Sequence, residues 1–277
     1  MRKKLFKLAT LILVVVMLAS VALPIASAGR WRELSRDNWY WEEAGNAWAL
    51  GWRQIDGTWY FFHTTETMWL DFADQGLMAR DQVVPIGNST FMFSPTGAMV
   101  TGWVNMPARV VGRSFITPVV TGQFYWTDGI WTGGTRAPLV AGAWYYFNAD
   151  GTMARNQWVQ DGDNWHRLGN DGRMLTGWNT IWDGGANQQF YLGDNGVMRT
   201  GWQRLDNLWY FFRPNGHMAR GWLEDGGVWY FLRTIDQAST TYPGGSMVAG
   251  PTNNFRIGDD LHAFASNGAW LGRVGPA

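Results

Sequence analysis

The chain has no cysteine, and it has no lysine after residue 7. Without cysteine no disulfide can form, so the fold must be held together by packing between neighbouring segments. Beyond residue 28 the chain carries 18 arginines against 22 acidic residues, a formal charge of −4. A chain without an excess of basic residues has no electrostatic field that would collect nucleic acid, and that class of partner is not expected.

Long apolar runs are absent except at the amino terminus. A basic start from Arg2 to Lys7 precedes the apolar run Leu8–Ala22, and the small residues Ala26-Ser27-Ala28 follow. This order predicts a secretory signal peptide over residues 1–28, cleaved after Ala28. The mature chain, 29–277, is then expected to be secreted to the cell surface or cell wall and to have no membrane span.

Tryptophan and glycine are abundant instead, with 20 and 35 residues. The tetrad Trp144-Tyr145-Tyr146-Phe147 begins nine residues before Met153, and Trp209-Tyr210-Phe211-Phe212 begins nine residues before Met218. This spacing predicts a repeat of about 20 to 24 residues. Longer gaps are interpreted as insertions at 64–75, 106–122 and 234–244. The expected units end at Trp48, Met78, Met99, Trp131, Met153, Met174, Met198, Met218, Met247 and Trp270.

Each unit has an alternating apolar stretch, an Asn-Gly or Asp-Gly turn and a second short apolar stretch. This pattern is typical of a β-hairpin. A single hairpin is marginally stable in water, whereas stacked hairpins cover one another. The sequence therefore predicts an all-β fold, a solenoid of about ten stacked β-hairpin repeats that forms one domain over residues 29–277.

The positions of the tetrad can be compared between units, with Trp144 to Phe147 as positions one to four. Position one varies and includes Thr90, Gln123 and Gln189. Position two is always a ring, so stacking is expected to depend on it and not on position one. The rings at position two are Tyr40, Tyr60, Phe91, Phe124, Tyr145, His166, Phe190, Tyr210, Tyr230 and His262.

A further indole precedes the tetrad in many units. Trp202, in a Gly-Trp pair, stands seven residues before Trp209, and Tyr230 is the position-two ring of the next unit. Together these rings predict a box with three aromatic walls, with Met218 near its floor. Such a box suits a quaternary ammonium, which is attracted to ring faces and has no N–H groups to satisfy. Several weak boxes on one array would bind through avidity.

Units of this form, as at Gly201–Met218, resemble the choline-binding or cell-wall-binding repeats of Gram-positive bacteria. They also resemble the glucan-binding repeats of secreted glucosyltransferases and toxins. The first resemblance implies a hairpin solenoid whose junctions hold the choline groups of teichoic acids. Transferred residue by residue, it implies boxes at Trp52, Trp59 and Phe91; Trp158, Trp165 and Phe190; Trp202, Trp209 and Tyr230; and Trp222, Trp229 and His262.

Several units depart from this pattern. Thr90, Gln123 and Gln189 remove one wall from their boxes, and Thr135 stands where the Gly-Trp indole of the unit ending at Met153 is expected. The insertion at 64–75 is expected to separate Phe91 from its partners. A further box is possible at Trp31, Trp39 and Tyr60, with a spacing of eight.

No catalytic centre is expected. The chain has no Gly-x-Ser-x-Gly motif and only five glutamates after residue 28. The four histidines, at positions 63, 166, 217 and 262, fall in different units without the close spacing of a metal site. Neither a metal nor a cofactor is expected, because turn chemistry accounts for the Asp-Gly and Asn-Gly pairs.

The aromatic boxes, together with what the resemblance implies, therefore favour a non-catalytic surface-attachment module for choline-bearing teichoic acid or another cell-surface polysaccharide. Gln189 and Gln123, at ring positions, leave glucan-type binding by aromatic stacking open. A structural adhesin that presents the insertion loops to a protein partner is the third hypothesis.

Overall fold

The computed structural model describes residues 29–67, 75–106, 126–127, 130–131, 139–250 and 252–277. The predicted signal peptide at 1–28 lies outside these residues. None of the described segments forms a helix with the length and apolarity needed to cross a membrane. The chain divides into two compact units, one reaching to Thr101 and including 150–152, the other formed by the rest from Gly102 to Ala277. The single domain over 29–277 remains a prediction.

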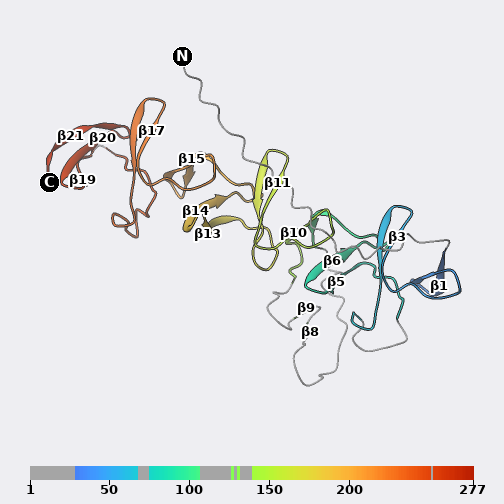
Figure 1. Cartoon of the computed structure of the whole chain (residues 1–277). Helices are drawn as coiled ribbons and strands as arrows, with labels where there is room; N and C mark the ends of the chain where they lie inside the picture. The colour runs from blue at the N-terminus through green and yellow to red at the C-terminus, as the bar shows by residue number, and fades with distance from the viewer. Residues whose placement is uncertain (1–28, 68–74, 107–125, 128–129, 132–138, 251) are drawn as a thin grey trace, which may run out of the picture. The chain divides into compact units, whose positions relative to one another are not determined.

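The first unit consists of three antiparallel hairpins, labelled in Figure 1. Each is formed by two strands that follow one another in the chain. They are β1 (Arg30–Ser35) with β2 (Asn38–Glu42), β3 (Gly51–Ile55) with β4 (Thr58–Phe62), and β5 (Gln82–Ile86) with β6 (Ser89–Phe93).

The second unit is also antiparallel throughout, and its last sheet has three strands. Its strands are β7 (Gly102–Asn105), β8 (Trp126–Thr127), β9 (Ile130–Trp131), β10 (Trp144–Phe147), β11 (Trp158–Asp161), β12 (Asn164–Arg167), β13 (Gly177–Asp183), β14 (Ala186–Leu192), β15 (Gly201–Leu205), β16 (Leu208–Phe212), β17 (Gly221–Asp225), β18 (Val228–Leu232), β19 (Thr252–Ile257), β20 (Asp260–Phe264) and β21 (Trp270–Pro276).

The all-β hairpin fold is confirmed, but the hairpin turns lie elsewhere than predicted. β15 and β16 are joined by Asp206 and Asn207, both left-handed with φ of 50° and 64°, as a tight two-residue turn requires. The Asn215-Gly216 pair makes a second turn, after which Met218 forms a single bridge to Phe212. Each repeat is thus a hairpin followed by a tight loop, and the Asn-Gly signal marks the loop.

The methionine of this loop connects consecutive repeats. Its N–H donates to the position-one carbonyl of the preceding hairpin, as from Met247 to Trp209 at 2.7 Å and from Met218 to Gln189 at 2.8 Å. Its side chain lies against the loop glycine of the following repeat. A Cβ added to Gly245 would come within 2.4 Å of Met218 Sδ. Methionine and glycine therefore form a packing pair across each link.

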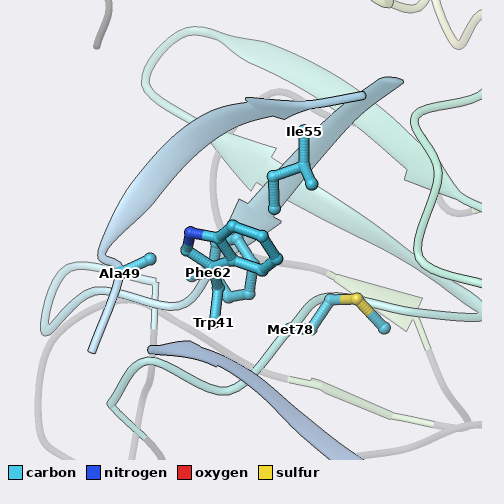
Figure 2. Packing of buried hydrophobic residues seen from close by; sticks show 5 residues of the cluster. All are labelled: Trp41, Ala49, Ile55, Phe62 and Met78. Atoms are coloured by element: carbon cyan, nitrogen blue, oxygen red, sulfur yellow. The ribbon is translucent and has the colours of Figure 1, made fainter. Parts of the chain in front are cut away.

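The core of each repeat is formed by the residue at position four and by its neighbours. Position four has no exposed surface in eight of the described hairpins. In the first unit, Figure 2 shows the Trp41 indole packed with Phe62, Ile55 and Met78. These fully buried position-four residues are Phe62, Phe93, Phe147, Leu168, Leu192, Phe212, Leu232 and Phe264.

One hairpin differs from the predicted register. β10 pairs with β7, so that Trp103 lies opposite Tyr146 and residues 106–143 are inserted within the hairpin. The Gly-Trp indole of this unit is therefore Trp103. The prediction that Thr135 stands at this position is wrong. The predicted unit ending at Trp131 corresponds to the two-residue strands β8 and β9 inside the insertion. The described residues thus contain nine regular hairpins besides this short pair.

Candidate aromatic sites between hairpins

The Gly-Trp indole packs at the junction between its own hairpin and the next. In β15, Trp202 lies opposite Phe211, with ring centroids 5.2 Å apart, and it also contacts Tyr230 of β18 at 4.9 Å. Both contacts are edge-to-face, the arrangement that aromatic pairs prefer. The position-two ring of one hairpin therefore packs on the indole of the hairpin before it.

The position-one indole completes the junction without being buried in it. Trp209 stands 6.5 Å from Trp202 with an interplanar angle of 84°, and it is 42% exposed. The two indoles form a corner of nearly perpendicular rings, and Tyr230 borders the same indole. These three predicted site residues are brought together.

The same corner occurs at two other predicted boxes. Trp222 and Trp229 are 6.3 Å apart at 80°, and Trp52 and Trp59 are 6.3 Å apart at 85°. The third ring follows in each case, with His262 at 5.3 Å from Trp222 and Phe91 at 4.8 Å from Trp52. Phe91 is thus not separated from its partners by the insertion. Three junctions share one geometry.

The box predicted at Trp158 is altered by an arginine. Trp158 contacts Phe190 at 5.1 Å, and Trp165 is 40% exposed. However, position three of this hairpin is Arg167, whose guanidinium carbon lies 5.8 Å from the Trp158 ring centroid. Burial lowers the pKa of Arg167. A positive group therefore already interacts with the ring that a ligand cation would need.

A junction that the sequence reasoning missed lies at Trp103. This indole contacts Tyr146 at 5.1 Å and His166 at 4.9 Å, and Trp144 in the same hairpin is 45% exposed. Burial lowers the pKa of His166, so its ring is neutral near pH 7 and can serve as an uncharged wall. The signal was present in Gly102-Trp103, but the long insertion concealed its strand partner.

Met218 is not placed where it was predicted. It packs with Tyr210 and Phe212, whereas Met247 belongs to the cluster that includes Trp202 and Tyr230. The reason is the direction of the link described above, since each methionine bonds to the preceding hairpin. Met247 therefore takes the position at the Trp202 junction that was assigned to Met218.

Two hydrogen bonds orient the walls of these sites. The Trp202 indole Nε1 donates to Asp225 Oδ2 at 2.9 Å, so a carboxylate lies at the edge of the box. At the last junction, Trp270 Nε1 donates to His262 Nδ1 at 3.1 Å. An indole N–H can only donate, so His262 accepts this bond through Nδ1.

Two further junctions lie at Trp31 and Trp178. Trp31 contacts Tyr60 at 5.0 Å, and Trp39 packs against the same cluster. Trp178 contacts Tyr210 at 4.9 Å, but its position-one neighbour is Gln189, as predicted from the sequence. Gln123 and Thr135 lie outside the described residues.

Over the described part of the chain, no group of three or more histidine and acidic side chains is placed to hold a metal.

Two sequence families match these hairpins. The choline-binding repeat matches residues 199–236, a segment that contains Trp202, Trp209 and Tyr230. The putative cell wall binding repeat matches residues 51–68, 140–153 and 156–174. No curated protein matches the chain.

One solved structure shows the same fold, and two others are similar to this chain. The choline-binding domain of CbpL from Streptococcus pneumoniae is 17% identical with a TM-score of 0.50, over 89% of this chain and 98% of that one. Choline binding protein F from the same organism is 23% identical with a TM-score of 0.39, over 88% and 93%. The autolysin LytC of Streptococcus pneumoniae is 17% identical with a TM-score of 0.48, over 91% of this chain and 48% of LytC. Over residues 51–68, 140–153, 156–174 and 199–236, the chain therefore matches the putative cell wall binding repeat and the choline-binding repeat.

Proposed function

We propose that this chain is a non-catalytic attachment module that binds choline groups of teichoic acids on a bacterial cell surface. The observation that carries the proposal is the corner of two perpendicular indoles, repeated with one geometry at Trp52, Trp202 and Trp222. Secretion through the signal peptide at 1–28 is part of the proposal. The module then acts outside the cell.

Exposure of the position-one indoles supports a binding role. Trp144, Trp165, Trp209 and Trp229 are between 40% and 45% exposed. Exposed indole surface does not stabilise the fold, whereas the Gly-Trp indoles of Trp52, Trp103 and Trp202 are half-buried and pack between hairpins. The outer indoles are therefore available to a ligand.

The chemistry of the corner favours a methylated amine. A trimethylammonium group spreads its charge over methyl groups and gains roughly 0.5 to 2 kcal/mol from a ring face. A primary ammonium needs three hydrogen-bond acceptors, which the indole faces do not supply. The Asp225 carboxylate beside Trp202 adds long-range attraction for a cation.

The test is retention on a quaternary-amine resin followed by elution with free choline. Residues 29–277 carry a formal charge of −4, so the experiment is run in about 1 M salt, where the Debye length is about 3 Å and ionic retention is suppressed. We expect choline to elute the chain and ethanolamine at the same concentration to leave it bound. Elution by both amines would contradict the proposal.

A multiple variant tests whether retention depends on the junctions or on other exposed indoles. Replacement of Trp59, Trp144, Trp165, Trp209 and Trp229 by alanine together is expected to abolish most retention while the far-UV spectrum is preserved. Trp182→Ala is the matched control, because it removes an exposed indole that is not part of a junction. Unchanged retention of the fivefold variant would show that the junctions are not the binding sites.

A further inference from the structure

The hairpin β13–β14 differs in length from the hairpins that follow it. Its strands have seven residues each, whereas those of β15–β16 have five. The additional length carries Trp182, which is 70% exposed and is the most exposed tryptophan among the described residues. Packing within the repeat does not account for this indole.

Strand register places Trp182 on a face of mixed chemistry. The opposed pairs are Trp178 with Tyr191, Thr180 with Gln189, and Trp182 with Asn187, and paired residues lie on the same face. Trp178 and Trp182 are four residues apart, about 13 Å along the strand. Between them the face presents hydroxyl and amide groups.

Gln189 replaces the indole that most other junctions have at position one. Its Oε1 accepts a hydrogen bond of 2.8 Å from Arg220 Nη2, and Arg220 Nε is buried without a partner in the described chain. Beside Trp178, which is 41% exposed, a ligand thus meets an amide and a guanidinium. A quaternary ammonium lacks its second wall here and is repelled by the positive charge.

The carboxylate nearest to this hairpin's tip is directed to the other face. Asp183 alternates with Trp182 along β13, and its Oδ2 is 2.6 Å from His217 Nε2. The face with the two indoles therefore has hydrogen-bonding side chains and no negative charge of its own. The Trp202 junction differs, because the Asp225 carboxylate lies at its edge.

We propose that this face binds an unbranched glycan strand, at a site that includes the Trp178 junction, where Gln189 replaces the second indole, and is separate from the complete aromatic junctions. A pyranose ring has an apolar face of C–H groups and a rim of hydroxyls. The Trp178 and Trp182 indoles stack on two sugar rings of one strand, and Thr180, Asn187 and Gln189 hydrogen-bond to the hydroxyls. Apolar surfaces with a few placed polar groups are the usual composition of such sites. The inference does not depend on choline binding.

The test is a calorimetric titration of the full chain in saturating choline. The probes are the hexamer of N-acetylglucosamine, for amino-sugar strands, and isomaltohexaose, for glucans. We expect one of them to bind. Trp182→Ala should weaken its binding at least 10-fold and leave choline binding unchanged, and Trp182→Phe should recover part of the loss. Binding of the N-acetylglucosamine hexamer would identify the ligand as an amino-sugar strand, and binding of isomaltohexaose would identify it as a glucan.

Trp209→Ala is the matched control, since it removes an exposed indole from a junction and should weaken choline binding only. Three results would overturn the inference. They are no binding of either hexamer at millimolar concentration, full binding by Trp182→Ala, or binding that choline displaces and Trp209→Ala abolishes. The last result would place the sugar in the complete aromatic junctions, and it would leave the choline proposal to be decided by the resin experiment.

Discussion

The indole Nε1 of Trp202 donates a hydrogen bond of 2.9 Å to Oδ2 of Asp225, and this bond joins two consecutive hairpins. Trp202 is at the start of β15 and Asp225 at the end of β17. The bond holds the indole plane at the angle that makes the corner with Trp209. Asp225 is thus a positioning residue for the junction, although it was not among the residues predicted from the sequence.

Asp225→Ala is expected to weaken choline binding at this junction by about 3- to 10-fold, the effect of losing a hydrogen bond worth about 1 kcal/mol. The measurement is a choline titration in a background where Trp59, Trp144, Trp165 and Trp229 are alanine, so that the Trp202 junction dominates. Asp225→Asn retains an acceptor and should lose less. Equal affinities of all three proteins would show that the bond does not orient the site.

The two indoles of the β7–β10 hairpin are expected to respond differently to substitution. Trp103→Ala removes a half-buried ring that packs on Tyr146 and His166, and it should cost about 2 to 4 kcal/mol of stability. Trp144→Ala removes an exposed ring and should cost less than about 1 kcal/mol. Urea unfolding measures both losses.

Trp103→Phe is the control for this pair. The Trp103 indole N–H is buried and has no partner in the described residues, so phenylalanine removes an unsatisfied donor while keeping a ring. Its loss of stability should be clearly smaller than that of Trp103→Ala. A large loss for Trp144→Ala would contradict the view that the position-one indoles serve a ligand.

Much of this arrangement follows from local sequence. The period, the hairpins and the rings at position two are determined by residues within one unit, and the Trp52, Trp202 and Trp222 corners follow from the seven-residue spacing. Contacts of this kind need no information from distant parts of the chain. The fold class and these three groups of rings could therefore be predicted.

The errors arose where a residue's partner is not fixed by local spacing. Trp103 pairs across an insertion, and a sequence period cannot show which strand resumes after it. Met218 bonds backward to Gln189, because the loop returns towards the preceding hairpin, and this direction has no sequence signal. Arg167 contacts the Trp158 ring and Asp225 accepts a hydrogen bond from Trp202. Residue spacing alone does not predict such side-chain contacts.

The contact between Gly245 and Met218 predicts an unusual sensitivity to a methyl group. Gly245 has φ of 88°, and a Cβ there would lie 2.4 Å from both Sδ and Cε of Met218. Gly221 has a similar φ of 78° with open space around its Cα. Gly221→Ala should cost about 1 to 2 kcal/mol from the backbone alone, and Gly245→Ala about 1 to 3 kcal/mol more.

The additional loss can be assigned by a second substitution. Met218→Ala in the Gly245→Ala background removes the overlap, so the two losses of stability should sum to more than the double variant shows in urea unfolding. Additive losses, or equal losses for the two glycine variants, would mean that the methionine moves aside without cost.

Acid is expected to destabilise the first unit through His63. Its side chain is buried, and desolvation lowers its pKa to about 4 from an ordinary value of 6.5. The unfolded chain therefore binds a proton between pH 6.5 and pH 4 while the folded chain does not. Stability is complete above pH 6.5 and falls as the pH decreases to about 4, by about 3 kcal/mol.

His63→Gln should flatten this part of the stability profile, since glutamine does not titrate. Glu42 provides the internal reference, because its hydrogen bonds from Arg30 and Arg32 lower its pKa from 4.5 to about 2. Its contribution is present above pH 4.5 and is lost below that value, in both proteins. Urea unfolding at pH 7, 5.5 and 4.5 measures the difference. If His63→Gln lost as much stability as the parent over this range, the loss would not come from His63, because the substitution removes that imidazole. The prediction would then be wrong.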